Sequence, residues 1–205
     1  MTDRSRQKSP LAMALLAMLT EQPMHTYRMH ELIKQRGKNT VVNVAQRNSV
    51  YQTIERLLRV GLIHVEQTTQ TEGRPERVIY GITQEGRDTL HTWLAEMLTT
   101  PVNEYPAFPA ALAFVMVLSP AKVQRELAAR CDALSQSLTV SQQATEALMK
   151  QGLPRLFLIE DEYKQAMQRA ELTWVQSLLD DMQHGRIDWN EAWLKDVAAT
   201  FEGGT

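Results

Sequence analysis

The feature that most restricts the fold is a change of hydrophobic periodicity downstream of residue 47. In the segment RNSVYQTIERLLRVGLI, residues 47–63, apolar residues recur at helical spacing, and Gly61 ends the pattern. These apolar residues are Val50, Ile54, Leu57 and Leu58. Apolar and polar residues then alternate over residues 62–66 and again over 78–82, which is typical of half-buried strands. The sequence therefore predicts a helix that is followed directly by two strands.

Further helices are predicted on both sides of this unit, at residues 10–19, 26–36 and 83–98. Their expected N-caps are Ser9, Thr26 and Thr83, and Pro10 fits the first helical position. The inward side chains of the second helix are expected to be Tyr27, Leu32 and Ile33. Residues 67–77, which have no periodicity and contain Gly73 and Pro75, are expected to form a loop. The order is three helices, two strands and a fourth helix.

This order, with a basic connection between the strands, is that of the winged helix-turn-helix, in which the second helix of the motif enters the DNA major groove by its N-terminal end. The residues expected at this end are Gln46, Arg47, Asn48, Ser49, Tyr51 and Gln52. Asn and Gln side chains can pair with adenine and Arg with guanine, while the helix N-terminus attracts phosphate. Arg74 and Arg77 in the loop could contact the adjacent backbone or minor groove.

Each of these features also has a purely structural interpretation. Ser49 and Gln52 match the S-x-x-Q capping box, whose side chains bind their own backbone. In that case only Arg47, Asn48 and Tyr51 remain for DNA. Arg74 and Arg77 could equally be solvated loop charges. The combination of helix order, capped third helix and basic hairpin nevertheless favours DNA binding more than any of these features alone.

Charge is distributed unevenly along the 205 residues, although the net charge is only −2. Residues 1–60 hold ten Lys and Arg against four Asp and Glu, a balance of +6. Residues 101–205 hold nine against fourteen, a balance of −5. This asymmetry favours an anionic partner for the N-terminal part only.

The C-terminal half is predicted to be helical after a proline-containing linker at residues 99–109. Its helices are expected at residues 108–118, 120–150, 156–184 and 191–201. The fold class is therefore mainly α with a small two-stranded β-hairpin. The expected domains are a winged helix-turn-helix at 9–99, a helical dimerisation domain at 108–185 and a C-terminal extension at 186–205.

Two apolar stripes mark the long helices as packing surfaces. One follows four- and three-residue spacing and comprises Leu127, Cys131, Leu134, Leu138, Ser141, Thr145 and Leu148. The other comprises Ile159, Tyr163, Met167, Ala170, Trp174 and Leu178. The two helices can form an intramolecular hairpin, because Gly152 and Pro154 permit a turn, or they can pair with a second copy. We expect both, and hence a homodimer.

The sequence resembles the PadR family of transcriptional regulators. The similar segments are LAMALLAMLTEQPMHTYRMHELI near the start, NSVYQTIERLLRVGLI, EGRPERVIYGITQEGRDTLHTWL and AELTWVQSLLDDM. The recognition-helix serine and tyrosine of the family correspond to Ser49 and Tyr51, and its wing motif to Gly73, Arg74 and Pro75. Thr26 stands where a glycine is usual and Gln52 where a proline is frequent. The tail after Gly185 has no obvious counterpart.

The resemblance implies a homodimeric, ligand-responsive transcription factor, most often a repressor, that binds double-stranded DNA at an inverted repeat. It also implies a small aromatic or hydrophobic effector. Domain junctions commonly hold such pockets. The aromatic residues expected near this junction are Trp93, Tyr105, Phe108 and Trp174. Aromatic residues at helical spacing are also usual core residues, so these four remain candidates.

The sequence argues against an enzyme, a metal site and a cofactor. The five histidines are dispersed, and no nucleophile elbow, phosphate-binding loop or paired-cysteine zinc spacing is present. The longest apolar run is too short to span a bilayer, and one cysteine, Cys131, fits a reducing cytoplasm. The alternative function is a protein-interaction module built on the same winged helix and helical hairpin.

Overall fold

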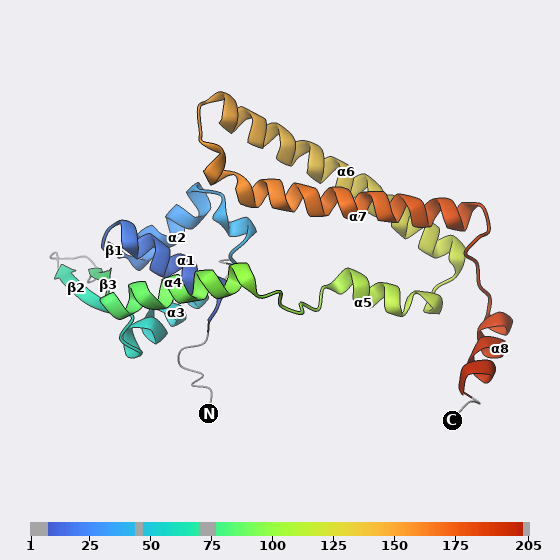
Figure 1. Ribbon diagram of the computed structural model, residues 1–205, viewed down its shortest axis with the longest axis horizontal. Helices are drawn as coiled ribbons and strands as arrows, with labels where there is room; N and C mark the ends of the chain where they lie inside the picture. Colours follow the sequence, from blue (N-terminus) through green and yellow to red (C-terminus); the bar gives the residue numbers. More distant parts are fainter. Residues whose placement is uncertain (1–7, 44–46, 70–76, 203–205) are drawn as a thin grey trace. The chain divides into compact units, whose positions relative to one another are not determined.

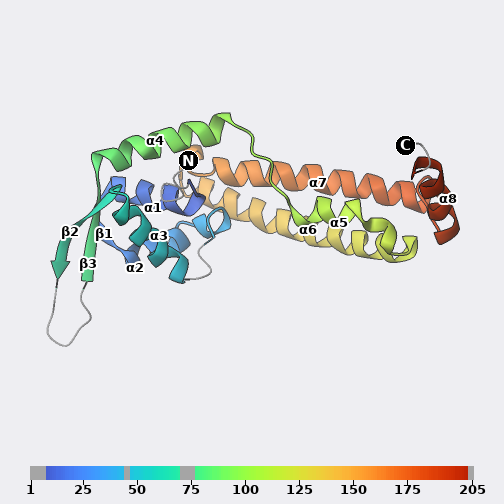
Figure 2. The same ribbon diagram turned by 90° about the horizontal axis from the view of Figure 1, so that it is seen from below.

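The computed structural model describes residues 8–43, 47–69 and 77–202. It divides into two compact units, Met1–Asn103 and Glu104–Thr205, which are described separately below. Figure 1 and Figure 2 show that the chain is mainly helical, with one small antiparallel sheet in the first unit. The predicted fold class is therefore confirmed.

The first unit begins with α1 (Pro10–Glu21), which starts as the sequence predicts. The Ser9 hydroxyl accepts a hydrogen bond from the backbone N–H of Ala12 at 3.2 Å, and Pro10 occupies the first helical position, where no intrahelical N–H is required. The helix ends at Gln22, whose extended backbone suits the residue before Pro23. One face of α1 is buried in the core of the unit.

The second helix, α2 (Thr26–Gln35), corrects the predicted cap by one residue. His25 is the N-cap, and its Nδ1 accepts a hydrogen bond from the backbone N–H of Arg28 at 3.0 Å. Thr26 is instead the first helical residue and is buried. Leu32 and Ile33 are buried as predicted, but Tyr27 is 57% exposed, so its predicted inward orientation is wrong. A short 3₁₀ helix, η2 (Lys38–Thr40), follows α2.

The third helix, α3 (Arg47–Arg59), begins two residues before Ser49. Ser49 therefore lies inside the first turn, and its carbonyl oxygen accepts a hydrogen bond from the Thr53 hydroxyl at 2.7 Å. The predicted capping box of Ser49 and Gln52 is wrong for this reason, since an N-cap residue must precede the helix.

The sheet contains a third strand that the sequence pattern did not reveal. β2 (Ile63–Thr69) and β3 (Arg77–Ile82) form the predicted antiparallel hairpin, and β1 (Met24–His25) pairs with the other edge of β3. β2 continues through Thr69, into the segment predicted as loop, and its pairing shifts between Val65 and Gln67. A two-residue strand is too short to show an alternating pattern.

The core of the first unit joins the helices to the hairpin. α1, α3 and α4 (Gln84–Thr99) contribute buried side chains such as Leu15, Ile54 and Leu90. Thr83 caps α4 as predicted: its hydroxyl accepts from the Gly86 N–H at 3.0 Å and donates to the Gly61 carbonyl at 2.8 Å. These two bonds fix the start of α4 against the end of α3.

The second unit is helical throughout its described residues. Its elements are α5 (Ala107–Ala113), η3 (Val115–Val117), α6 (Pro120–Lys150), η4 (Arg155–Phe157), α7 (Ile159–Gln183) and α8 (Glu191–Glu202). α6 and α7 pack side by side as an antiparallel pair, which is the hairpin allowed by the sequence (Figure 1). Gly152 in the connection has a φ of 86°, in the region that favours glycine.

The contact between α6 and α7 changes in character along its length. Toward the beginning of α6 it is apolar, with Val123 and Leu127 packed on Val175 and Met182. Toward the turn it is polar: the Gln165 side-chain amide donates to the hydroxyls of Ser141 at 3.1 Å and of Thr145 at 3.0 Å. A hydrogen-bonded polar layer of this kind specifies how two helices align.

Candidate nucleic-acid interface

The third helix, α3, has one buried and one exposed face. Val50, Ile54 and Leu57 are each no more than 2% exposed and belong to the core of the first unit. Asn48 and Gln52 are exposed, and Tyr51 is 50% exposed. The apolar stripe therefore anchors α3, while its N-terminal half presents hydrogen-bonding side chains to solvent.

Contacts at the C-terminal end of α3 hold it in place. The Arg56 guanidinium donates to the Ser9 hydroxyl at 3.4 Å, which connects α3 to the start of α1. At the C-terminal end, Gly61 has a φ of 74° and the Leu62 N–H donates to the Leu57 carbonyl at 3.0 Å. This closing motif turns the chain directly into β2. The orientation of the exposed face is thus set by the fold of the whole unit.

A second tyrosine lies beside the exposed face of α3. Tyr27 of α2 and Tyr51 of α3 line the same shallow depression, together with Thr26, His30 and Val50. Tyr27 was predicted to point inward, so it was not among the predicted surface residues. The signal that could have identified it is its position one residue into α2, directly after the buried Thr26.

The phenol of Tyr80 on β3 is close enough to α3 to be affected by its charges. Burial raises the pKa of Tyr80 above the ordinary value, and the charges of Glu55 and Tyr51 act in the same direction. A tyrosine is already neutral at neutral pH, so this shift leaves the charge near α3 unchanged.

The structure describes only part of the predicted DNA-contacting set. It places Asn48, Ser49, Tyr51 and Gln52 together within the first two turns of α3. Arg47 opens α3 and Arg77 opens β3, but only their backbones are described. Gln46 and Arg74 lie outside the described residues. The roles of all eight residues in DNA binding remain predictions.

The second unit contains a pocket of about 610 Å³. It is lined by Pro106, Ala107, Phe108, Pro109, Leu112, Arg130, Glu171 and Trp174. The Arg130 guanidinium lies 3.6 Å from the centroid of the Phe108 ring, and its Nε donates to Glu171 Oε1 at 2.6 Å. The rings of Phe108 and Trp174 meet edge to face, with centroids 6.3 Å apart. The volume is within the range of small-molecule sites, and the walls are mainly apolar.

Two of the four predicted ligand-binding residues, Phe108 and Trp174, meet in this pocket. Tyr105 is 91% exposed and does not line it, while Trp93 is buried in the core of the first unit. Arg130 and Glu171 supply its charged groups and were not predicted. They are 41 residues apart on different helices, so no local motif could have indicated their pairing.

The described residues contain no cluster of three or more His, Cys, Asp or Glu side chains that could hold a metal ion. Cys131 is half-buried on α6, and burial together with the charge of Asp132 raises the pKa of its thiol. No helix in the described part of the chain is both long and apolar enough to cross a membrane.

Comparison with solved structures shows that the fold is shared with known transcriptional regulators. Bacillus subtilis PadR, solved in complex with operator DNA, gives a TM-score of 0.69 at 19% identity and covers 85% of this chain and 99% of that chain. The same regulator, solved in complex with p-coumaric acid, gives 0.68 at 19% identity, covering 84% and 98%. The Vibrio cholerae virulence activator AphA gives 0.60 at 19% identity, covering 85% and 98%.

Comparison with curated protein sequences gives no match. Residues 15–92, from α1 into α4, match the model of the transcriptional regulator PadR-like family. This segment contains α3, the hairpin and most of the core that positions them. Over residues 15–92, this chain is similar to the PadR-like family of transcriptional regulators.

Proposed function

We propose that this regulator is a homodimeric, ligand-responsive repressor that binds an inverted-repeat operator through α3 and the hairpin. The observation that carries the proposal is the division of α3 into a buried apolar stripe and an exposed N-terminal end with Asn48, Tyr51 and Gln52. A DNA-binding regulator acts where the genome lies, and we expect this to be the cytoplasm.

The exposed end of α3 has the chemistry that base recognition requires. Asn48 and Gln52 can form paired hydrogen bonds with adenine in the major groove, and Arg47 with guanine. Tyr51 and Tyr27 can donate hydrogen bonds to phosphate oxygens, and the free N–H groups of the helix end attract the same oxygens. Arg74 and Arg77, at the hairpin, would add backbone or minor-groove contacts. The DNA complex of B. subtilis PadR supports this assignment by its shared fold.

The same change at the two ends of α3 tests the assignment. Arg47→Ala removes a cation from the first turn, and Arg59→Ala removes one from the exposed last turn. Binding of each variant to duplex DNA is measured by fluorescence anisotropy across a salt series. We expect Arg47→Ala to weaken binding by about 1–3 kcal/mol, whereas Arg59→Ala stays within about 0.5 kcal/mol of the parent protein.

Equal effects of the two substitutions would contradict the placement of DNA at the N-terminal end of α3. Duplex binding by the parent protein that does not weaken with salt would contradict a DNA contact altogether, because phosphate neutralisation releases counterions. That result would favour the alternative function, a protein-interaction module.

Dimerisation is proposed because one winged helix neutralises few phosphates. Non-specific binding of such modules is weak, with Kd about 10⁻⁴–10⁻⁶ M at physiological salt. Two modules on half-sites one helical turn apart would raise both affinity and specificity. The surface that supports the proposal is the stripe on α7, in which Tyr163, Met167 and Trp174 are each about half exposed or more, at 66%, 50% and 49%. Contiguous exposed apolar side chains commonly mark interaction surfaces.

The effector is proposed to occupy the pocket between α5, α6 and α7. The rings of Phe108 and Trp174 can contact a planar aromatic group, and Arg130 can donate hydrogen bonds to its polar substituent. The p-coumaric acid complex of B. subtilis PadR makes phenolic acids the first class to try. Ligand binding would then favour a conformation of the dimer that binds the operator less well.

A thermal-shift panel tests the pocket. Phenolic acids, their amides and uncharged aromatic compounds are compared on the parent protein and on Phe108→Ala. A control, Tyr105→Ala, removes an aromatic side chain that is 91% exposed and does not line the pocket. We expect a stabilising ligand to lose its effect in Phe108→Ala and to keep it in Tyr105→Ala. A ligand whose shift survives Phe108→Ala binds elsewhere, and the pocket assignment would then be wrong.

A further inference from the structure

The last helix, α8 (Glu191–Glu202), has an apolar face that its own unit leaves uncovered. Trp193 is 51% and Phe201 80% exposed, while Leu194 and Val197, at helical spacing between them, are partly buried. α8 has 12 residues, and isolated helices shorter than about 12–15 residues are marginal in water. A helix of this length and pattern therefore requires a packing partner.

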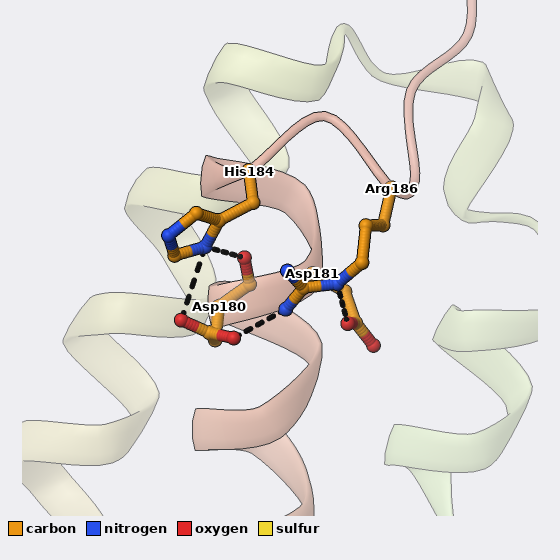
Figure 3. A network of polar contacts seen from close by, with 4 residues as sticks. All are labelled: Asp180, Asp181, His184 and Arg186. Atoms are coloured by element: carbon orange, nitrogen blue, oxygen red, sulfur yellow. Dashed lines mark hydrogen bonds and ion pairs between the residues drawn. The ribbon is translucent and has the colours of Figure 1, made fainter.

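The connection that precedes α8 is held firmly to the end of α7 (Figure 3). The Arg186 guanidinium bridges two carboxylates: its Nε donates to Asp181 Oδ1 at 2.6 Å, and its Nη2 pairs with Asp180. His184 Nδ1 lies 2.8 Å from the Asp180 carbonyl oxygen and 3.1 Å from its Oδ1. The backbone N–H of Arg186 donates to the Asp181 carbonyl at 2.8 Å. These contacts fix the direction in which the chain leaves α7.

The residues immediately before α8 are fixed as well. The Trp189 indole N–H donates to the Leu118 carbonyl at 2.9 Å, and its ring packs against the apolar cluster between α6 and α7. The Asn190 side-chain oxygen then accepts from the Trp193 N–H at 2.9 Å and starts α8. With its base held in this way, α8 keeps Trp193 and Phe201 exposed to solvent.

The end at which α6 and α7 are joined lies opposite the end that leads to α8 (Figures 1 and 2), and it carries a second group of exposed apolar side chains. We call it the closed end, and its exposed side chains are Leu148, Met149, Leu156, Phe157 and Ile159. Leu156 is 70% and Phe157 55% exposed. From residue 148 to residue 159 the only charged residues are Lys150 and Arg155, of which Arg155 pairs with Glu162 at 2.8 Å. α8 carries three acidic residues and one lysine.

We propose that α8 of each subunit packs on the closed end of the partner subunit, in a dimer whose α7 helices run antiparallel. The inference rests on the dimer proposed above and adds its orientation and a second contact. In an antiparallel two-fold arrangement, α8 at one end of the helix pair meets the closed end of the other copy, and this contact occurs twice. The α7 stripe of Tyr163, Met167 and Trp174 lies between the two contacts.

The parallel arrangement fits the same surfaces less well. It would bring the two acidic α8 helices next to each other, where like charges repel. It would also place the two closed ends side by side, with Lys150 of one copy near Lys150 of the other. The antiparallel arrangement covers both apolar surfaces and sets the acidic α8 beside the basic Lys150.

Crosslinking between single-cysteine subunits tests this geometry on the full-length protein. Cys131→Ala supplies a cysteine-free background. Ala198→Cys places a thiol on exposed α8, and Gln151→Cys places one at the closed end. Gln136→Cys is the matched control, because it makes the same change in the exposed middle of α6, 15 residues (about 22 Å of helix) from Gln151. The Ala198→Cys subunit carries an affinity tag, so that mixed dimers are identified by their mass after treatment with a short bismaleimide. Sedimentation velocity reports the oligomeric state.

We expect a crosslinked mixed dimer from Ala198→Cys with Gln151→Cys, and at least tenfold less from Ala198→Cys with Gln136→Cys. Crosslinking of Ala198→Cys with itself would show a parallel dimer and overturn the proposal. Equal or no crosslinking in both mixtures, with sedimentation as a dimer, would overturn the α8 contact and leave the proposed dimer intact. Sedimentation as a monomer at every concentration would overturn both.

Discussion

At the scale of single residues, the close approach of Gly86 to the preceding strand is the strongest local constraint in the first unit. A Cβ atom at this position would lie 2.1 Å from the Leu62 carbonyl oxygen and 2.8 Å from the Ile82 side chain. The backbone of α4 therefore packs directly on Leu62, in the turn before β2, and on β3, and only glycine leaves enough room. The sequence shows the glycine but not the neighbour that requires it.

Gly86→Ala should consequently destabilise the first unit. Overpacking of this kind typically costs about 1–3 kcal/mol, and a contact with backbone rather than with a flexible side chain places it at the upper end. Urea denaturation measures the free energy of unfolding, with Asp88→Ala on the exposed side of the same helix turn as control. The control should change it by less than about 0.5 kcal/mol. An unchanged midpoint for Gly86→Ala would show that the packing at this site is looser than described.

A second residue-scale prediction concerns pH. Two hydrogen bonds at 2.5 and 2.7 Å connect the Arg36 guanidinium, at the end of α2, to the Glu21 carboxylate, at the end of α1. The hydrogen bond to Arg36 holds the pKa of Glu21 below its usual value, and the charge of Arg36 contributes in the same direction. The unfolded chain therefore binds the Glu21 proton more readily than the folded chain does.

The stabilisation from this pair should be fully present above the unfolded pKa, about 4.3, and should be lost as pH falls through the lower folded pKa. Both side chains are partly exposed, so its size is at most about 1 kcal/mol. Glu21→Gln should flatten the pH dependence of the unfolding midpoint below about pH 4.5. A parallel acid-destabilisation curve for the variant and the parent would mean that the ion pair does not contribute.

Residue-scale features were also where prediction from sequence was least accurate. Ser9 and Thr83 were identified correctly as caps, because a proline or a clear strand end marks the boundary. Thr26 and Ser49 were misplaced by one and two residues, since serine and threonine are compatible with both the cap and the first turn. Tyr27 was assigned to the core by spacing alone, although the rotation of α2 exposes it.

At the scale of elements, the order of helices and strands followed from periodicity, because long segments reveal which face is buried. The exception is β1, whose two residues depend on β3 for their pairing and have no pattern of their own. The turn of the α6–α7 pair was predicted from Gly152 and Pro154. The stripe on α7 was predicted as a packing surface, but whether it faces α6 or solvent could not be determined from one sequence.

The polar layer between α6 and α7 gives an element-scale prediction. Gln165 is 5% exposed and donates to the hydroxyls of Ser141 and Thr145 across the helix pair. Gln165→Ala should lower the free energy of unfolding by about 1–3 kcal/mol, because buried polar groups lose their partner. Gln168→Ala, the same change on the same helix at an exposed hydrogen bond to Ser137, should cost about 0.5 kcal/mol or less.

The measurement is urea denaturation followed by circular dichroism at one fixed protein concentration, since dimerisation would contribute to apparent stability. Equal losses for the two glutamine variants would indicate that the polar layer adds no more than a surface contact does. In that case the apolar cluster of Val123, Leu127, Val175 and Met182 alone would hold α6 on α7.

At the scale of the whole molecule, the proposed dimer is tested by charge on the α7 stripe. Met167→Glu places a carboxylate in the middle of the stripe, and Val140→Glu makes the same kind of change at an exposed apolar residue of α6. We expect sedimentation to show at least a tenfold weaker dimer for Met167→Glu and little change for Val140→Glu, because a buried unpaired charge is costly. The reverse order would place the interface on α6.

The ligand pocket shows what a single sequence cannot supply at this scale. Phe108 and Trp174 were nominated because they are aromatic and were expected near the domain junction, and they meet in the pocket. Trp93 and Tyr105 met the same criterion and lie elsewhere. The distinction depends on tertiary contacts between helices far apart in the chain, which spacing within one helix does not encode.

We propose that this protein is a dimeric regulator that recognises a specific DNA sequence through α3. The most direct measurement is selection from sheared DNA of the source organism: purified protein is incubated with the fragments at moderate salt, and the bound fragments are sequenced. We predict a small set of fragments that share an inverted repeat with half-sites about one helical turn apart. Retention of fragments without a common sequence, or no retention in the absence and in the presence of candidate ligands, would contradict the claim.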